Sequence, residues 1–444
     1  MNKHIVKNFE NPPATSANFL LNLACCVLFF VAMHLLRYFF PHDETLRLVL
    51  IGLIITAIPL WLYDLFYLKV YKRPSAGLLI KSGETNLQRL VFKLIGLYFT
   101  YLVILIFYKF NPVYYISDKA ANFYGVFFCI FYKWGPLFLL ISTFYFWMID
   151  RRQKDPYDEY WQMGCLLMGR LKEVNGVVLQ EYARAWFIKA FFVPFMFALL
   201  VTYADSILQW RWDGASLMPL YNHLLDMFYA VDILFGVLGY ILALRLLDTH
   251  IQSTEPTVLG WLVCLACYSP FYSIVGIGLL PEQSVLQWDQ WLASNPVLFY
   301  TCGASIIILS LIYALATVAI GYRMSNLTYR GLITSGPYRF TKHPAYLSKV
   351  ASWWLVSLPF LSTEGLVAAS IQSLSMTAIT VLYYLRAKTE ENHLSNYPEY
   401  VQYAEWINDH GMFSFLGKIF PALKYSEERA RRSNSVVWFK KMRK

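Results

Sequence analysis

Two short segments in the last third of the chain carry side chains that could hold and act on a polar small molecule. Gly336–Leu347 reads Gly-Pro-Tyr-Arg-Phe-Thr-Lys-His-Pro-Ala-Tyr-Leu, and Arg386–Leu394 reads Arg-Ala-Lys-Thr-Glu-Glu-Asn-His-Leu. Each lies at the end of an apolar run, where ionisable groups are costly and are usually kept for function. Together they predict an active site at a membrane surface.

The prolines and the glycine of the first segment predict a loop rather than a continuing helix. Pro337 and Pro344 each restrict the residue before them to extended geometry, and Gly336 tolerates unusual backbone angles. Such a loop can present backbone amides to a ligand. His343 would then lie where the next helix begins, close to its positively polarised end.

The order and spacing of these segments resemble the isoprenylcysteine carboxyl methyltransferase and phospholipid methyltransferase superfamily of integral membrane enzymes. That superfamily has Gly-Pro-Tyr-Arg, two residues and His-Pro-x-Tyr-Leu, then a helical hairpin and Arg, three residues, Glu-Glu, two residues and Leu. A Tyr-x-x-Tyr element closes the pattern and falls in Tyr397–Tyr403 here. Many members have Phe-Gly before that element, whereas this chain has Tyr-Pro-Glu. The resemblance covers roughly residues 297–415.

This resemblance implies direct methyl transfer from S-adenosylmethionine to an oxygen, nitrogen or sulfur atom of a lipid or lipid-modified acceptor, at the cytoplasmic face. The cofactor needs hydrogen-bond acceptors for its amine and ribose, donors for its carboxylate, and apolar or aromatic walls. In the superfamily, the His-Pro histidine and the glutamates contribute to the cofactor site, and the arginine lies near the acceptor. Arg386 would orient an anionic acceptor by bidentate contact.

We therefore expect the following site residues and no metal site. The catalytic residues are Arg386 and Glu390, and the cofactor-binding residues are Tyr338, Arg339, His343, Pro344, Tyr346, Glu390, Glu391, Tyr400 and Tyr403.

Other interpretations of the same residues stay open. Arg339 and Lys342 could be cytoplasmic anchors, and Glu390 and Glu391 could form a solvated helix end that pairs with Arg386. An NADPH-dependent sterol or steroid reductase has a similar C-terminal arrangement, but with Asn at the position of Ala345, Gly-Glu at Ser348-Lys349 and Arg-Asp at Glu390-Glu391. A nonenzymatic membrane protein that retains the motif is the third alternative.

The composition predicts the elements that position these residues. The chain is 57% hydrophobic and 15% charged, far more apolar than the 45–50% of soluble domains. We predict an all-α integral membrane protein with about ten transmembrane helices, since each needs about 20 residues. The predicted runs lie near 19–40, 47–68, 90–109, 122–148, 187–210, 220–246, 257–280, 298–320, 345–361 and 366–386.

Basic residues gather in alternate loops, around residues 69–81, 151–172 and 323–342. By the positive-inside rule, these loops and both termini face the cytoplasm. The loop 150–185 also has an amphipathic pattern, typical of a helix that lies on the membrane. We expect a multi-pass protein of a bacterial inner membrane rather than of the endoplasmic reticulum.

We divide the chain into an N-terminal bundle of about seven helices (1–295) without an assigned function, a methyltransferase-like unit (296–415) and a basic cytoplasmic tail (416–444). The stretch from Lys418 to Lys444 has nine Lys or Arg against two Glu. Such a tail favours contact with anionic lipids rather than nucleic acid. The oligomeric state is unknown.

Two polar features of the N-terminal part allow more than one interpretation. Lys133 and Asp232 lie at similar apparent membrane depth and could pair, either structurally or as a lining for a substrate headgroup. Cys264 and Cys267 form a C-x-x-C pattern in the middle of an apolar run without a second ligand pair, so we interpret them as core residues.

Overall fold

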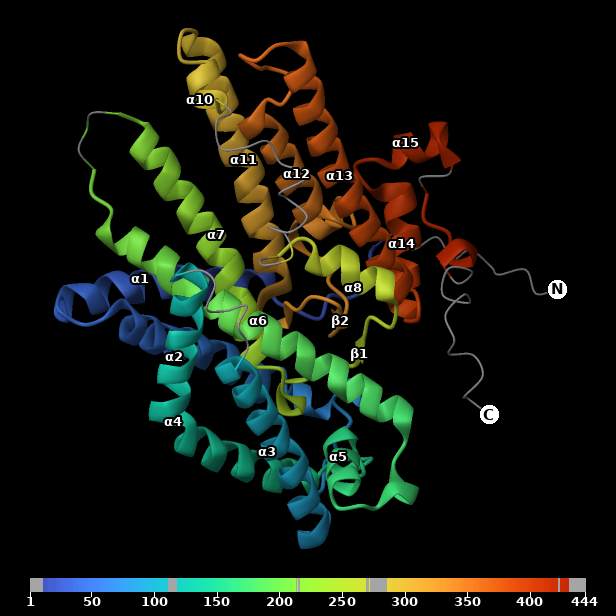
Figure 1. Ribbon diagram of the computed structural model, residues 1–444. Coiled ribbons are helices and arrows are strands. Elements are labelled where there is room, and N and C mark those ends of the chain that lie inside the picture. The colour runs from blue at the N-terminus through green and yellow to red at the C-terminus, as the bar shows by residue number, and fades with distance from the viewer. Residues whose placement is uncertain are drawn as a thin grey trace.

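The computed structural model describes residues 11–110, 118–212, 214, 216–268, 271, 286–421 and 424–430, and it describes side chains outside residues 118–131. The predicted all-α architecture is confirmed (Figure 1). The strands β1 (Ser253–Thr254) and β2 (Thr328–Tyr329) form one short antiparallel pair. The helices are α1 (Phe19–Phe39), α2 (Thr45–Leu62), α3 (Leu87–Phe110), α4 (Asp118–Asp150), α5 (Glu159–Leu167), α6 (Gly176–Gln209), α7 (Met218–Ile241), α8 (Val258–Leu265), α10 (Trp288–Trp291), α11 (Pro296–Ile320), α12 (Pro344–Ser357), α13 (Leu366–Leu394), α14 (Pro398–His410) and α15 (Ser414–Ile419).

Polar caps fix where several of these helices begin. The side chains of Asn18, Asp158, Asn175, Thr257 and Asn295 each accept a hydrogen bond from a backbone N–H in the following turn. Such a cap satisfies one of the backbone donors that a first helical turn leaves without a partner. Of the long apolar helices, α1, α6 and α11 therefore start at positions that the sequence marks with a small polar residue.

Seven helices in the described part of the chain are long and apolar enough to cross a membrane, and they coincide with seven of the ten predicted runs. The helix at the predicted run 345–361 is shorter than expected. This helix, α12, has 14 residues and ends before Leu358, whose φ is +38°. Parts of the runs 122–148 and 257–280 lie outside the described residues or side chains. The total of about ten and the sides of the termini stay predictions. The spans are α1, Thr45–Tyr67, α3, α6, α7, Pro296–Arg323 and α13.

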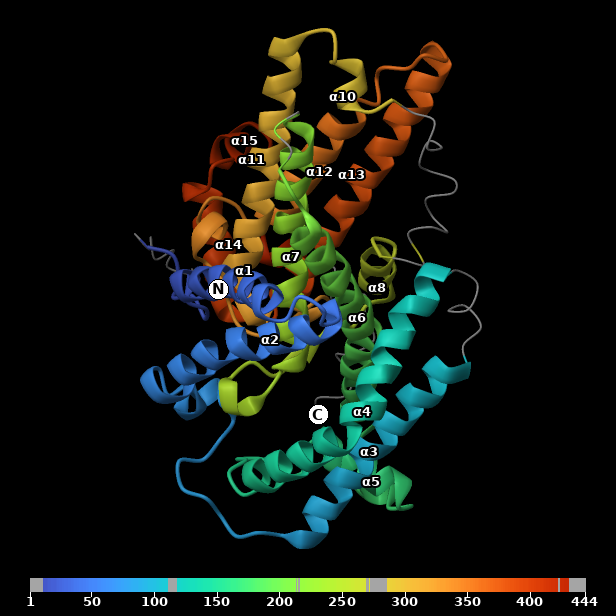
Figure 2. The same ribbon diagram turned by 90° about the vertical axis from the view of Figure 1, so that its left-hand side faces the viewer.

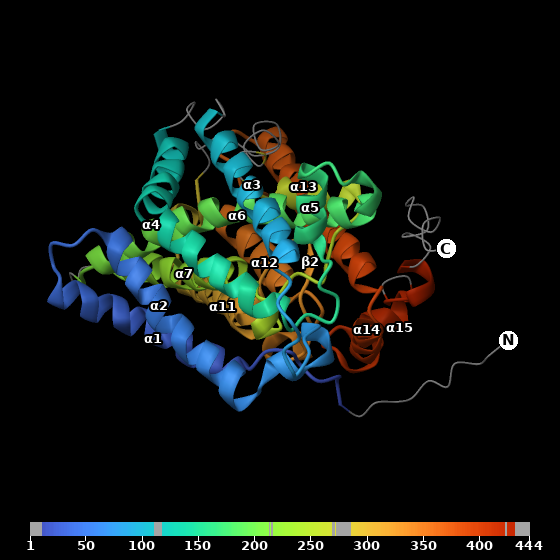
Figure 3. The same ribbon diagram turned by 90° about the horizontal axis from the view of Figure 1, so that it is seen from below.

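The core connects the two halves of the chain. A large cluster of buried apolar side chains combines residues of α1, α2, α6 and α7 with Ala314 and Val318 of α11. Figure 2 shows α1 and α2 lying across α7 and α11, while α11, α12 and α13 run side by side. On another side of the molecule, α3 packs against α4 and α5 (Figure 3).

The predicted division near residue 295 stays a prediction, and several contacts cross it. Strand β1 pairs with β2, α7 packs against α11, and the buried Arg323 donates hydrogen bonds to the carbonyl oxygens of Asp248 and Arg330. The N-terminal bundle therefore positions the loop that carries the first motif. Most of the basic tail, residues 431–444, lies outside the described part.

Candidate active site

The two motifs meet at a cavity of about 170 Å³ between the loop after α11 and the helices α12, α13 and α14. Residues from the N-terminal bundle, Asp232 and Tyr268, complete its wall. The sequence-predicted residues that line it are Tyr338, His343, Tyr346, Arg386, Glu390, Tyr400 and Tyr403.

The loop that precedes α12 folds as its glycine and prolines predict. Gly336 has a φ of +58°, and a Cβ there would lie 3.1 Å from the ring of Phe19. Both the backbone conformation and the lack of space for a side chain therefore favour glycine. A short 3₁₀ turn covers Gly336–Arg339, and α12 begins at Pro344 directly after His343. Tyr338 faces the cavity, whereas Arg339 is exposed and is not part of the cavity wall.

Glu391 anchors this loop to α13. Its Oε1 lies 2.6 Å from Nζ of Lys342 and 3.2 Å from Nε2 of His343, and its Oε2 lies 2.8 Å from Nζ of Lys388. Glu391 is buried and, like Pro344, does not line the cavity. Burial lowers the pKa of Lys342, while the Glu391 carboxylate acts in the opposite direction. The geometry therefore fits Glu391 as the acid that holds the motif loop in place.

The neighbouring Glu390 has a different environment. Its side chain is exposed, lines the cavity and accepts a hydrogen bond of 2.8 Å from the hydroxyl of Tyr346. The Tyr346 ring stacks on the ring of His343, with centroids 5.5 Å apart and planes 6° from parallel. Glu390 can thus offer its carboxylate to a ligand beside an aromatic wall.

Arg386, one turn before Glu390 on α13, is a buried cation of the cavity wall. Its Nη2 donates to Oδ1 of Asn326 at 2.7 Å and to the hydroxyl of Tyr268 at 3.2 Å. Its guanidinium also lies over the ring of Tyr346, 4.9 Å from the centroid. Within the described residues, no carboxylate lies at ion-pair distance from it, so the pairing with Glu390 considered from the sequence is not formed. The buried charge is available to an anion.

Two tyrosines of α14 close the cavity. The hydroxyl of Tyr403 donates to the carbonyl oxygen of Tyr338 at 2.7 Å and so fixes the motif loop. The hydroxyl of Tyr400 is buried and has no hydrogen-bond partner among the described residues. Burial raises the pKa of Tyr400 well above its ordinary value, so the hydroxyl stays protonated and can donate to a ligand.

Some residues of the cavity wall belong to neither motif and were not predicted from the sequence. Lys349 lies about one turn after Tyr346 on α12, and its ammonium stands over the rings of Tyr313 and Trp353 at 5.0 and 5.3 Å. A lysine three positions from a motif tyrosine on a predicted helix is the signal that could have found it. Asn326 and Tyr268 carry no such signal, because only the tertiary fold brings them to Arg386.

The considered pair of Lys133 and Asp232 is not what the structure shows. The Asp232 carboxylate accepts hydrogen bonds from the hydroxyl groups of Tyr313 and Thr317 on α11, with 2.8 Å for Thr317, whereas Lys133 is exposed on α4. Sequence depth alone did not reveal that α7 turns Asp232 toward α11. Asp232 does line the cavity, as the headgroup interpretation required.

No curated protein and no solved structure matches this chain. The motif loop, α12 and all of α13 lie within one region that a family model recognises, whereas Tyr400 and Tyr403 lie beyond it. Residues 299–396, the C-terminal part of the chain, match the model of the Isoprenylcysteine carboxyl methyltransferase (ICMT) family, and the resemblance inferred from the motifs is thereby confirmed for this part.

Proposed function

We propose that this protein is an integral membrane methyltransferase that uses S-adenosylmethionine and acts on a lipid or a lipid-modified amphiphile at the cytoplasmic face. Two findings support the coarser part of this proposal: the match of residues 299–396 to a methyltransferase family, and seven helices that are long and apolar enough to cross a membrane. The observation that carries the finer part is the cavity on which Glu390, Arg386 and Tyr400 converge.

The residues of the cavity fit the chemical groups of the cofactor. The exposed Glu390 carboxylate suits an amine or a ribose diol. The hydroxyl of Tyr400, which has no partner among the described residues, can donate to a carboxylate or a ring nitrogen. Tyr346, Tyr383 and Tyr338 supply aromatic walls. The volume of about 170 Å³ is below the usual ~300–1,000 Å³ of cofactor sites. The cavity as described therefore holds only part of the cofactor, and the rest would extend beyond it.

S-adenosylmethionine, when bound, supplies an electrophilic methyl group for a single displacement. The protein's own part is positioning and exclusion of water. Arg386 is suited to hold an anionic acceptor, because its guanidinium is buried and has only neutral partners in the described structure. Lys349 stands on the same wall, but the Asp232 carboxylate of the same cavity offsets its charge, so the preference for an anion rests on Arg386. The geometry favours an acceptor with a carboxylate or phosphate.

We further propose that the N-terminal bundle contributes to the choice of acceptor. The support is that Asp232 of α7 and Tyr268 line the same cavity as the motifs. Substitution of Asp232 by Asn should preserve cofactor binding and lower acceptor methylation. A bacterial inner membrane as the location, and anionic lipids as partners of the basic tail, belong to the same proposal.

Titration calorimetry of the purified protein in detergent tests the cofactor directly. We expect binding of S-adenosylmethionine and S-adenosylhomocysteine but not of NADPH. Binding of NADPH alone would instead support the reductase alternative, and binding of neither would favour a nonenzymatic role. Lipid extracts of cells with and without the protein, compared by mass spectrometry for a methyl-group difference, then identify the acceptor.

A further inference from the structure

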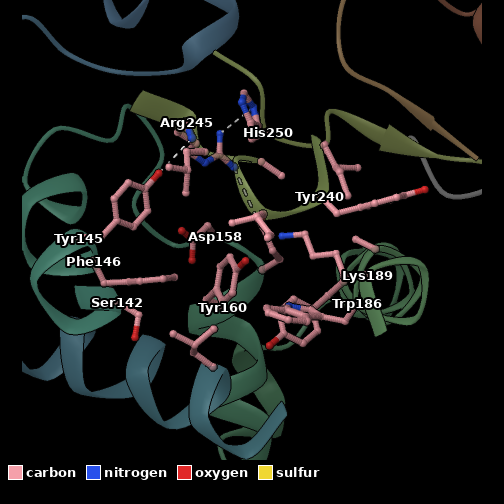
Figure 4. Close-up of a pocket in the computed structure, with 18 of the residues that line it drawn as sticks. Ser142, Tyr145, Phe146, Asp158, Tyr160, Trp186, Lys189, Tyr240, Arg245 and His250 are labelled. Carbon is pink, nitrogen blue, oxygen red and sulfur yellow. Dashed lines mark hydrogen bonds and ion pairs between the residues drawn. The ribbon is translucent and has the colours of Figure 1, made fainter. Parts of the chain in front are cut away.

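A second and larger cavity lies in the N-terminal bundle, outside the region that matches the family model. It has a volume of about 770 Å³ and lies between α3, α4, α5, α6 and the segment 240–254. Figure 4 shows side chains from these elements pointing into one space, including Tyr145, Phe146, Tyr160 and Lys189. The volume falls within the ~300–1,000 Å³ typical of small-molecule sites.

One end of this cavity is apolar. Leu97, Ile104 and Leu105 of α3, Phe138 and Ile141 of α4, and Val193 of α6 line it. Helices α3 and α6 are long and apolar enough to cross a membrane, and α4 is also long and apolar. A hydrocarbon chain can therefore lie between them without exposing apolar surface to water.

The other end is polar, and its acidic groups already have cationic partners. Asp158 lies 3.1 Å from Nζ of Lys93, and Glu159 lies 3.6 Å from Nη2 of Arg245. Glu181 lies 2.6 Å from Nη2 of Arg184 and also accepts from Thr254. These acids are neutralised within the protein and do not demand a cationic ligand.

Lys189 is different. It is partly buried, and its ammonium stands 4.9 Å from the centroid of the Trp186 ring. Among the described residues, no carboxylate lies within ion-pair distance of it, although Asp158 points into the same space in Figure 4. An ammonium group taken out of water without a counter-ion is strongly unfavourable. Its position facing the cavity points to an anion bound there.

A second polar atom at this end also lacks a partner in the described structure, namely Nδ1 of His250. Arg245 donates to Nε2 of this ring at 3.3 Å, so Nε2 is the acceptor and a neutral ring carries its proton on Nδ1. Burial and the nearby arginines lower the pKa of His250 to about 3, which keeps the ring neutral. Besides Lys189, the polar end thus has the Nδ1–H of His250 as a second hydrogen-bond donor for a ligand.

We propose that this cavity is a binding site for an anionic amphiphile, with its carboxylate or phosphate on Lys189 and its hydrocarbon chain between α3, α4 and α6. The site is separate from the cavity of the motifs. Ser253 and Thr254 of β1 line the larger cavity, whereas Thr328 and Tyr329 of β2 line the cavity of the motifs. The strand pair therefore carries residues of both sites.

The test uses two probes with the same chain, a long-chain fatty acid with a fluorophore at its far end and the corresponding alcohol. Purified protein in uncharged detergent should bind the acid and bind the alcohol at least about tenfold more weakly, a difference that one charge-assisted contact can supply. Lys189→Met should remove this preference for the acid, and Lys189→Arg should retain it. Val193→Trp, which fills the apolar end, should weaken binding of both probes.

Lys133→Met is the matched control, because Lys133 is an exposed lysine of the same bundle outside the cavity wall. It should leave both affinities unchanged. Gel-filtration profiles and melting transitions establish that each variant is folded. Equal affinity of the wild-type protein for acid and alcohol, an unaltered preference in folded Lys189→Met, or undiminished binding in folded Val193→Trp would each overturn the proposal.

Discussion

The hydroxyl of Ser253 on β1 lies 2.8 Å from Nε2 of His393 near the end of α13, and it also accepts a hydrogen bond from the hydroxyl of Tyr397. The imidazole has a second ring nitrogen, Nδ1, and which of the two ring nitrogens donates depends on the tautomer. Nδ1 faces Glu255 at 3.9 Å. A strand of the N-terminal bundle is thus tied to the helix that carries Glu390, Glu391 and Arg386.

Substitution of Ser253 by Ala should weaken this connection. Loss of the hydroxyl leaves buried nitrogen and oxygen atoms without partners, at a cost of about 1–3 kcal/mol in the free energy of unfolding. Thermal melting followed by tryptophan fluorescence measures the effect. Ser370→Ala is the control, since Ser370 is exposed on α13 and, in the described part of the chain, donates to the carbonyl oxygen of Leu366 in its own helix. Equal melting of the two variants would contradict the connection described.

The adjacent glutamates should separate into a structural and a ligand-binding residue. Glu391→Gln removes the charge that holds Lys342, His343 and Lys388, and a broken buried ion pair costs on the order of 3 kcal/mol of stability. Glu390→Gln changes an exposed side chain and should leave melting unaltered, while the affinity for S-adenosylhomocysteine falls about tenfold or more. Calorimetric titration and melting of both variants form the test. A reversed pattern would exchange the two assignments.

Arg386 should affect the acceptor more than the cofactor. Arg386→Lys keeps a positive charge but loses the planar fork that reaches Asn326 and the face of Tyr346. We expect kcat/KM for the acceptor to fall about ten- to a hundredfold, with affinity for S-adenosylhomocysteine within about twofold of wild type. The comparison with Lys349→Arg, on the same wall, shows whether any change of cation suffices. A loss of cofactor affinity equal to the loss of activity would place Arg386 in the cofactor site instead.

The sequence predicted seven of the long helices, because a long apolar run is a local signal. It also brought the two motifs together, since a helical hairpin between them returns the chain to the same membrane surface. What it missed are contacts between distant segments. Asn326 in the loop after α11 and Tyr268 in the turn after α8 meet Arg386 only in the folded protein, and no sequence periodicity predicts these contacts.

The different environments of neighbouring residues were also beyond sequence reasoning. Glu390 and Glu391 have the same chemistry, yet successive residues on a helix point about 100° apart, so one faces the cavity and the other faces Lys342. Arg339 belongs to the motif but is exposed, because the 3₁₀ turn directs Tyr338 inward in its place. Both outcomes depend on helix rotation, which only packing fixes.

Acidification should destabilise the protein through His250. Burial, with Arg245, Arg330 and Arg323 nearby, lowers the pKa of His250 from 6.5 to about 3, so between these values the unfolded chain binds a proton that the folded chain does not. Stability is therefore lost as the pH falls below 6.5, by on the order of 2 kcal/mol at pH 5.

Melting curves of the wild-type protein between pH 7 and 5 should shift to lower temperature. His250→Gln removes the titrating group and should flatten that dependence, because its amide stays neutral throughout. If the wild-type and variant curves shift equally, other groups carry the acid sensitivity, and the buried neutral state of His250 is not its cause.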